Sequence, residues 1–291
     1  MVLSRAFAIG ASCLALSAAT VQAAPVAGAP AETVAPAVPG NEKATLTTPD
    51  GRQLDVFITL PASPRGVIVF SHGGGSSPQA TQLLYAHLAQ QGFAVLAPLH
   101  TDSLKMPEER RTSLQAALGT RAGDMRTVGG YVAQRFPGLP LGLVGYSYGS
   151  LAAIMGAGAL SPVIPGEIEG VDAVVMFSSP GPIPGLMDMP TAFTGVTEPT
   201  LLITGTADTV PGFVPDPALH LVYLDRLPEG DHTAFVVKDA THGFIGGAEA
   251  GMDEVAPLAM DFLLSRMLGD EAAGKRFDGA KSSERVDVRR R

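Results

Sequence analysis

The chain has 291 residues, of which 46% are hydrophobic and 16% charged, and its formal net charge is −8. This length allows one large domain or two small ones, and the hydrophobic content excludes an intrinsically disordered protein. The acidic balance, with no cluster of Lys and Arg before the extreme C-terminus, argues against partners such as nucleic acid or an anionic membrane surface.

The N-terminus has the pattern of a secretory signal peptide. Arg5 precedes a short run of small and apolar residues over 6–19, and Val21-Gln22-Ala23 then gives the small-x-small pattern of a cleavage site. The apolar run is too short to span a bilayer, so we expect no stable membrane insertion. We therefore predict a signal peptide over 1–23, cleaved near Ala23, and a periplasmic or secreted protein.

The remaining chain divides by composition into three parts. Residues 24–42 are rich in Ala and Pro and predict a flexible linker, and residues 43–268 predict the folded domain. Residues 269–291 mix both charge signs with few apolar residues, which predicts a disordered tail. The only cysteine, Cys13, lies in the signal peptide, so the mature chain would have no disulfide and no thiol nucleophile.

From residue 43 onward, strands and helices alternate. Period-two alternation on both sides of Pro49-Asp50-Gly51 predicts a β-hairpin. Short apolar runs then alternate with segments of helical spacing, as in an α/β fold with a mostly parallel sheet covered by helices on both faces. The predicted strands are 67–70, 93–97, 141–144, 171–177, 200–204 and 233–238, and the predicted helices are 79–91, 108–136, 150–160 and 252–267.

The clearest catalytic pattern is Gly145-Tyr146-Ser147-Tyr148-Gly149. Five-residue matches of this kind also occur by chance, so the inference depends on the context. The pattern follows a predicted strand and opens a predicted helix, which is where a tight turn holds a nucleophilic serine above a sheet edge. We expect Ser147 to be a nucleophile; the alternative is a turn that only joins a strand to a helix.

A serine hydroxyl needs a base, and the chain has six histidines. His242 follows the predicted strand 233–238, and catalytic loops of open α/β sheets lie at the carboxyl ends of strands. His232 precedes that strand, and we expect it, His87 and His220 to be surface or capping residues. His242 is the predicted general base.

The predicted orienting acid is Asp208, which follows the penultimate predicted strand. It lies between Ser147 and His242 in the chain, and the order Ser, Asp, His is that of one class of serine hydrolases. The alternative is a turn or N-cap aspartate. Asp216 and Asp239 are the reserves.

A glycine-rich run, Ser71-His72-Gly73-Gly74-Gly75, directly follows the predicted strand 67–70. Glycines let backbone N–H groups point into a site, and acyl transfer needs such donors for the oxyanion. The N–H groups of Gly74 and Tyr148 are the predicted oxyanion hole. A phosphate cradle is the weaker alternative, because neither a phosphate-loop lysine nor a dinucleotide fingerprint follows.

Together these motifs resemble the alpha/beta-hydrolase superfamily over residues 43–268. Residues 70–74, 86–98 and 121–124 are similar to bacterial dienelactone-hydrolase-like proteins and to platelet-activating-factor acetylhydrolase-like serine hydrolases. True dienelactone hydrolases use a cysteine nucleophile where this chain has Ser147, so their substrate is not implied. In the acetylhydrolase-like group, the third residue of the His-Gly-x motif donates to the oxyanion.

Many members of this superfamily carry a helical cap domain after the sixth strand. Here residues 180–199 separate two predicted strands, which is too short for a cap domain, so we expect a flexible loop beside the site. We predict an open, shallow, mostly apolar cleft. Its expected substrate-binding residues are Tyr146, Met187 and Phe193, with Tyr148 and Met189 beside them.

The leading hypothesis is hydrolysis of a small carboxylic ester through a serine acyl-enzyme, with no metal and no cofactor. One alternative keeps the same triad for an amide, peptide, lactone or polyester. The other is a catalytically silent binding protein on the same fold. The expected partner is a small-molecule ester, and the sequence does not indicate the oligomeric state.

Overall fold

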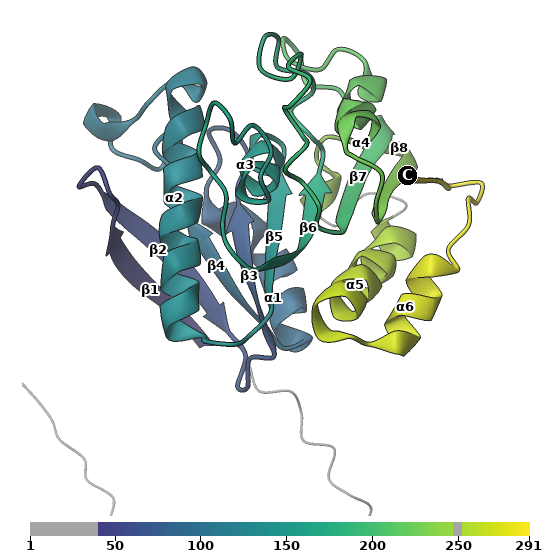
Figure 1. The fold of residues 1–291 in the computed structure, drawn as a ribbon, viewed down its shortest axis with the longest axis horizontal. Coiled ribbons are helices and arrows are strands. Elements are labelled where there is room, and N and C mark those ends of the chain that lie inside the picture. The colour runs from purple at the N-terminus through teal and green to yellow at the C-terminus, as the bar shows by residue number, and fades with distance from the viewer. Residues whose placement is uncertain (1–39, 247–251) are drawn as a thin grey trace, which may run out of the picture. The chain divides into compact units, whose positions relative to one another are not determined.

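A mixed sheet forms the centre of the computed structural model, which describes residues 40–246 and 252–291 (Figure 1). Across this sheet the strands lie in the order β1 (Gly40–Thr47), β2 (Gln53–Leu60), β4 (Phe93–Pro98), β3 (Gly66–Ser71), β5 (Leu141–Tyr146), β6 (Val171–Phe177), β7 (Thr200–Ala207), β8 (His232–Thr241) and β9 (Val286–Arg290). The strands from β4 to β8 in this order are parallel, whereas β1, β2 and β9 pair antiparallel. The mostly parallel sheet predicted from the sequence is confirmed.

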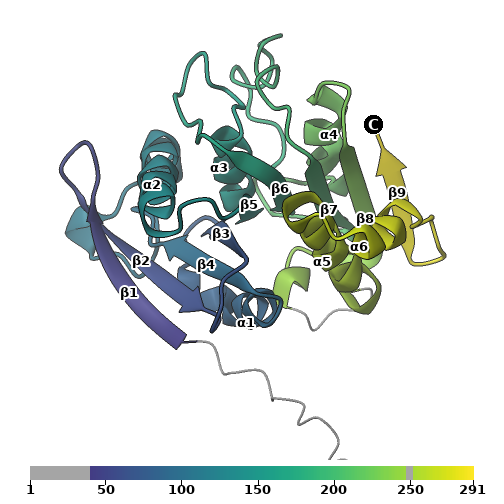
Figure 2. The same ribbon diagram turned by 60° about the horizontal axis from the view of Figure 1, so that its bottom comes forward.

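Helices cover both faces of the sheet (Figure 2). One face carries α2 (Leu114–Arg135), α3 (Tyr148–Gly156) and α4 (Val222–Arg226), and the other carries α1 (Gln82–Gln90), α5 (Met252–Leu268) and α6 (Glu271–Asp278). Every residue of β3 and β4 is buried, as expected for strands that are covered on both sides. Each face of the sheet therefore has its own apolar core. Because the central strands are parallel, their carboxyl ends all lie at the same end of the sheet.

The C-terminal residues do not form the predicted disordered tail. Phe277 of α6 is buried against Phe262 of α5, with ring centroids 5.1 Å apart. Beyond α6, β9 pairs antiparallel with β8, from Val237 opposite Val286 to Thr233 opposite Arg290. The prediction is wrong because α6 has an apolar side despite its many charges, and because backbone pairing stabilises β9.

The predicted linker also ends earlier than residue 42, because β1 begins at Gly40, which is paired with Leu60. The predicted signal peptide and residues 24–39 of the linker lie outside the described residues, so export and a periplasmic or secreted location stay predictions. In the part of the chain that the structure describes, no helix is long and apolar enough to cross a membrane.

The connection between β6 and β7 contains no helix or strand, and all of its residues are described. This agrees with the prediction that no cap domain is inserted there. No helical cap is therefore inserted between these two strands, at the carboxyl end of the sheet.

Candidate active site

Ser147 lies at the turn between β5 and α3, with φ 53° and ψ −122°. A positive φ is unfavourable for a residue with a Cβ, so the surrounding structure must hold this turn in place. Two glycines make the turn possible. A Cβ at Gly145 would lie 2.2 Å from the carbonyl oxygen of Gly149, and a Cβ at Gly149 would lie 2.0 Å from that of Ser71. The sequence thus forms the tight strand-to-helix turn that was predicted.

The structure brings Ser147, His242 and Asp208 together in one hydrogen-bonded chain. His242 Nε2 lies 3.0 Å from Ser147 Oγ, and His242 Nδ1 lies 2.7 Å from Asp208 Oδ1. An ionised carboxylate only accepts hydrogen bonds, so Nδ1 carries the proton and Nε2 can accept the proton of the serine hydroxyl. We call this hydrogen-bonded series of three side chains the exposed chain, because the His242 side chain is 24% exposed.

Hydroxyl groups complete the shell of the Asp208 carboxylate. Ser178 and Thr204 donate to its Oδ2, at 2.5 and 2.8 Å. Burial disfavours the charge, but hydrogen bonds from His220 and His242 outweigh it and hold the pKa of Asp208 well below its ordinary value of 3.8. Asp208 is therefore an anion at neutral pH. No sequence pattern marks Ser178 or Thr204 as donors to this carboxylate.

The reserve aspartates have other partners. Asp216 accepts a hydrogen bond from the backbone N–H of Ala218, as an N-cap residue does. Asp239 is exposed, and its backbone N–H donates to Thr206 Oγ1. Neither side chain takes part in the exposed chain.

The glycine-rich loop after β3 packs against the serine turn. A Cβ at Gly73 would lie 3.6 Å from Ser147 Cβ, and a Cβ at Gly74 would lie 3.6 Å from Tyr148 Cβ. Tyr148 is the first residue of α3, where a backbone N–H has no acceptor within the helix. Among the described residues, neither Gly74 N–H nor Tyr148 N–H has a protein acceptor. The two predicted donors are therefore available to an oxygen atom bound beside Ser147.

The buried ion pair between Arg121 and Asp102 stabilises this loop. The Arg121 guanidinium donates to both carboxylate oxygens of Asp102, each at 2.8 Å, and to the carbonyl oxygens of His72 and Gly73, at 2.6 and 3.1 Å. Asp102 accepts the Gly75 N–H at 3.0 Å. Although burial opposes the charge, Arg121 lowers the pKa of Asp102 to about 2. The ion pair thus fixes the orientation of successive peptide groups in the loop.

A second Ser–His–Asp chain lies under the same loop. His100 Nε2 lies 2.9 Å from Ser71 Oγ, and His100 Nδ1 lies 2.9 Å from Asp124 Oδ2. All three side chains are fully buried, so we call this second hydrogen-bonded series the buried chain. Burial and the charge of Arg121 hold the pKa of His100 well below 6.5, so its ring is neutral. Arg121 donates to Ser71 Oγ at 3.1 Å, and Arg52 donates to Asp124 Oδ1 at 2.9 Å.

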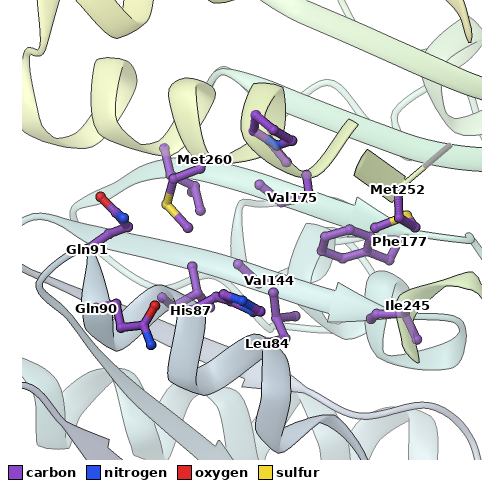
Figure 3. A pocket seen from close by; sticks show the side chains of 15 residues that line it. Leu84, His87, Gln90, Gln91, Val144, Val175, Phe177, Ile245, Met252 and Met260 are labelled. Atoms are coloured by element: carbon purple, nitrogen blue, oxygen red, sulfur yellow. The ribbon is translucent and has the colours of Figure 1, made fainter. Parts of the chain in front are cut away.

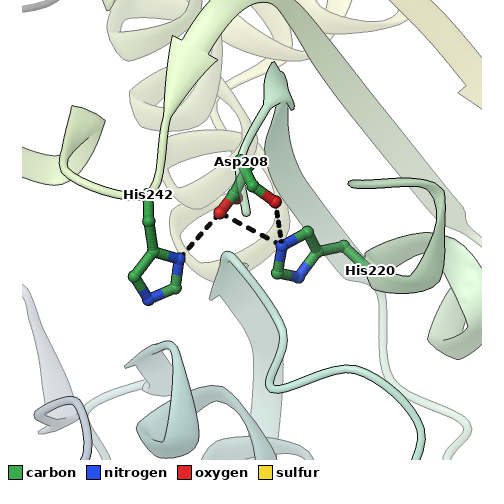
Figure 4. Close-up of side chains that lie close together, drawn as sticks. All are labelled: Asp208, His220 and His242. Atoms are coloured by element: carbon green, nitrogen blue, oxygen red, sulfur yellow. Dashed lines mark hydrogen bonds and ion pairs between the residues drawn. The ribbon is translucent and has the colours of Figure 1, made fainter. Parts of the chain in front are cut away.

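His220, expected at the surface, is fully buried beside Asp208 instead. Its Nε2 lies 2.9 Å from the carbonyl oxygen of Asp208 and 3.1 Å from Oδ1, and its Nδ1 lies 2.5 Å from the carbonyl oxygen of Ser179. Figure 4 shows Asp208 between the imidazoles of His220 and His242. The expectation was wrong because the sequence around His220 does not indicate which residues its side chain contacts in the folded protein. His232 is buried as well.

Comparisons with known proteins agree with this architecture. A dienelactone hydrolase from Anabaena variabilis superposes with a TM-score of 0.60 at 23% identity, covering 79% of this chain and 99% of that protein. An esterase from Pyrococcus furiosus superposes with a TM-score of 0.58 at 18% identity, covering 78% and 93%. This chain has the alpha/beta-hydrolase fold.

The sequence comparisons are less specific than the structural ones. No family model matches the chain. Two proteins from Mycobacterium tuberculosis strains, provisionally named phosphoribosyl transferases, are 32% identical over 222 residues. The alignment covers 75% of this chain but 45% of each relative, so the chain spans less than half the length of these proteins.

On this alpha/beta-hydrolase fold, two of the predicted substrate-binding residues do not line an open cleft. Met187 and Phe193 are buried in the core on the α4 side, where Phe193 packs edge-on against Tyr223. Their prediction as cleft residues is wrong, because the loop folds these side chains inward. Tyr146 does lie at the site: its hydroxyl donates to the carbonyl oxygen of His242 at 2.6 Å, and the two rings are 5.1 Å apart.

A cavity of about 340 Å³ lies between α1 and α5, over β5 and β6 of the sheet (Figure 3). Its lining is mostly apolar and includes Val144, Phe177, Ile245 and Met260, with the exposed His87 at α1. No residue of the exposed chain or of the glycine-rich loop contributes to the described lining. The cavity is therefore separate from the candidate site.

One group in the described residues brings its carboxylate and imidazole atoms close enough for a metal, within 4.8 Å of one another, and it is Asp208, His220 and His242. Both imidazoles already hydrogen-bond to the carboxylate, and its second oxygen accepts two hydroxyls. These hydrogen bonds account for the arrangement, so we assign no metal to it.

Proposed function

We propose that this protein is a serine hydrolase that cleaves a small carboxylic ester through an acyl-enzyme on Ser147. The observation that carries the proposal is the exposed chain, in which Ser147 Oγ, His242 and the Asp208 carboxylate are hydrogen-bonded in sequence. A serine becomes a useful nucleophile when a histidine can take its proton and a carboxylate orients that histidine.

The proposed reaction uses the atoms of the exposed chain and of the glycine-rich loop. His242 Nε2 takes the proton of Ser147 Oγ as the oxygen attacks the ester carbonyl, and Asp208 stabilises the resulting imidazolium. The N–H groups of Gly74 and Tyr148 would bind the oxyanion. His242 then returns the proton to the leaving alcohol, and a water molecule activated by the same ring hydrolyses the acyl-enzyme.

The surroundings of the site support a small ester with an apolar part. No helical cap is inserted between β6 and β7, at the end of the sheet that carries Ser147. The side chain of Leu104 is largely exposed and lies beside Gly75, 3.7 Å from the position of a Cβ there. An apolar acyl or alcohol group would find exposed apolar surface next to the proposed oxyanion hole.

The names of the similar proteins support hydrolysis more than transfer. The two structural neighbours, a dienelactone hydrolase and an esterase, share the fold of this chain. The phosphoribosyl transferase name belongs to relatives of which more than half is unmatched. No observation in the candidate site favours that activity, so we do not propose it.

Hydrolysis of a 4-nitrophenyl ester series, from acetate to palmitate, tests the proposal. We expect turnover of the short-chain esters by the wild-type protein and none above background in Ser147→Ala. A parallel amide and lactone panel would reveal the alternative substrates of the same triad. Wild-type protein that turns over no substrate of either panel, and that a serine-reactive phosphonate does not label, would instead indicate a catalytically silent binding protein.

A further inference from the structure

Among the described residues, both ring nitrogens of His220 face hydrogen-bond acceptors. Nε2 faces the carbonyl and carboxylate oxygens of Asp208, and Nδ1 faces the carbonyl oxygen of Ser179. The Ser179 hydroxyl lies 3.4 Å from Nδ1, but it donates its own proton to the carbonyl oxygen of His220 at 3.0 Å. A neutral imidazole has one N–H and one lone pair, so it would direct a lone pair at an oxygen that has no proton to give.

We propose that His220 is a buried imidazolium that shares the Asp208 carboxylate with His242, and that it thereby keeps the proposed hydrolase active at lower pH. This inference rests on the function proposed for Ser147. Because His220 would not touch the substrate, it is a positioning residue that acts through Asp208 and His242.

The charge balance around His220 is consistent with a cation. Burial disfavours the charged ring, but the hydrogen bonds that the ring donates to Asp208 and the negative charge of that residue outweigh this and raise the pKa of His220 above 6.5. The carboxylate that supplies this stabilisation is fully buried, so solvent screens the interaction only weakly.

The groups around the His220 ring come from several neighbouring elements. The loop after β6 contributes the hydroxyl and carbonyl of Ser179, the loop after β7 contributes Asp208, and His242 after β8 lies nearly parallel, with ring centroids 6.2 Å apart. Two further polar groups lie on elements next to His220 but are paired elsewhere: Asp216 is exposed and accepts the backbone N–H of Ala218, and the phenol of Tyr223 donates to the carbonyl oxygen of Gly181. Asp208 is thus the one anion that faces the ring within the described part of the chain.

This shared carboxylate has a consequence for the proposed general base. In an ordinary Ser–His–Asp chain, the full negative charge of the carboxylate favours a charged histidine. Here the charge of His220 offsets part of that of Asp208, and it repels a positive charge on the ring of His242. A second positive charge beside the same carboxylate is therefore disfavoured while His220 is charged.

His220→Gln tests the proposal, because a glutamine amide keeps an N–H donor for Asp208 but carries no charge. We measure kcat/KM for 4-nitrophenyl acetate as a function of pH and expect the acid limb to move up by about one pH unit. The matched control is His87→Gln, which makes the same change at an exposed position on α1 and should leave the limb in place. A uniform loss of rate with an unmoved acid limb would overturn the proposal.

A second measurement depends neither on turnover nor on the folding of the His220→Gln variant. In nitrogen-15 NMR of the Ser147→Ala protein, we expect both ring nitrogens of His220 to carry protons at neutral pH. A ring nitrogen with a free lone pair would overturn the proposal, even in an active enzyme. Conversely, a doubly protonated His220 in a wild-type protein that hydrolyses no ester would contradict the proposed function but not the assigned charge.

Discussion

Two hydrogen-bonded Ser–His–Asp chains lie within this domain, and they use the same atoms in the same order. In the exposed chain the two distances are 3.0 and 2.7 Å, and in the buried chain both are 2.9 Å. They differ in access: the His242 side chain is 24% exposed, whereas that of His100 is fully buried. Hydrogen-bond geometry is thus shared by both, and only one chain can meet a substrate.

The surroundings of the two chains differ in a second respect, which is charge. Four donors surround the Asp208 carboxylate, and the pKa of that group is well below its ordinary value. Burial instead raises the pKa of Asp124 to about 6. The exposed chain therefore retains an anion that can stabilise a charged histidine. The buried chain holds a neutral histidine and connects the glycine-rich loop to α2.

Replacing each serine should separate the two chains most clearly. Ser147→Ala should lower kcat for 4-nitrophenyl acetate by about 10⁴- to 10⁶-fold, because the nucleophile is lost. Ser71→Ala should change kcat by no more than about tenfold, but it should lower the free energy of unfolding by about 1–3 kcal/mol, since Arg121 and His100 lose a buried partner. Equal loss of turnover in both variants would contradict the comparison.

Arg121→Met should destabilise the protein more than any surface change. It would leave the carboxylate of Asp102 buried without its cation, and removal of one partner of a buried ion pair costs about 3–5 kcal/mol. Urea unfolding measures the effect. Arg285→Met is the matched control, because its ion pair with Asp253 is exposed and its loss should leave the unfolding midpoint in place. Similar midpoints for the two variants would show that Arg121 does not stabilise the loop.

The carboxylate of the buried chain should give stability a distinctive pH dependence. The pKa of Asp124 is about 6 in the folded protein, above the ordinary value of 3.8, so the folded state binds the proton more tightly. The resulting stability is complete below the ordinary value and is lost as the pH rises through about 6. Over this window the wild type should lose about 3 kcal/mol relative to Asp124→Asn, measured by urea unfolding at each pH. Parallel curves for the two proteins would contradict this assignment.

Much of the fold could be predicted because its signals are local. The apolar run before Ser147 and the glycines around it predict β5, the turn and α3 from neighbouring residues alone. β9 lacks such a signal, because Val286 and Val288 are its only apolar residues. Its order depends on pairing with β8, about fifty residues earlier in the chain, and no local pattern indicates a partner at that distance.

The same limit applies to the site. Its three central residues could be predicted because each follows a strand, and the carboxyl ends of parallel strands meet at one edge. Arg121 and His220 could not, since in sequence a charged residue with a buried partner looks like one that faces solvent. Met187 and Phe193 failed for the opposite reason: the sequence does not show which apolar side chains of a loop turn into the core.

The position of β9 also bears on self-association. As the outermost strand beside β8, it is short and carries the exposed Arg289 and Arg290, features that discourage backbone pairing between molecules. Removal of residues 286–291 would expose the unpaired N–H and C=O groups of β8, the strand that leads to His242. Without β9, β8 would then offer a template for intermolecular strand addition, so we expect β9 to protect the molecule against aggregation near its proposed catalytic base.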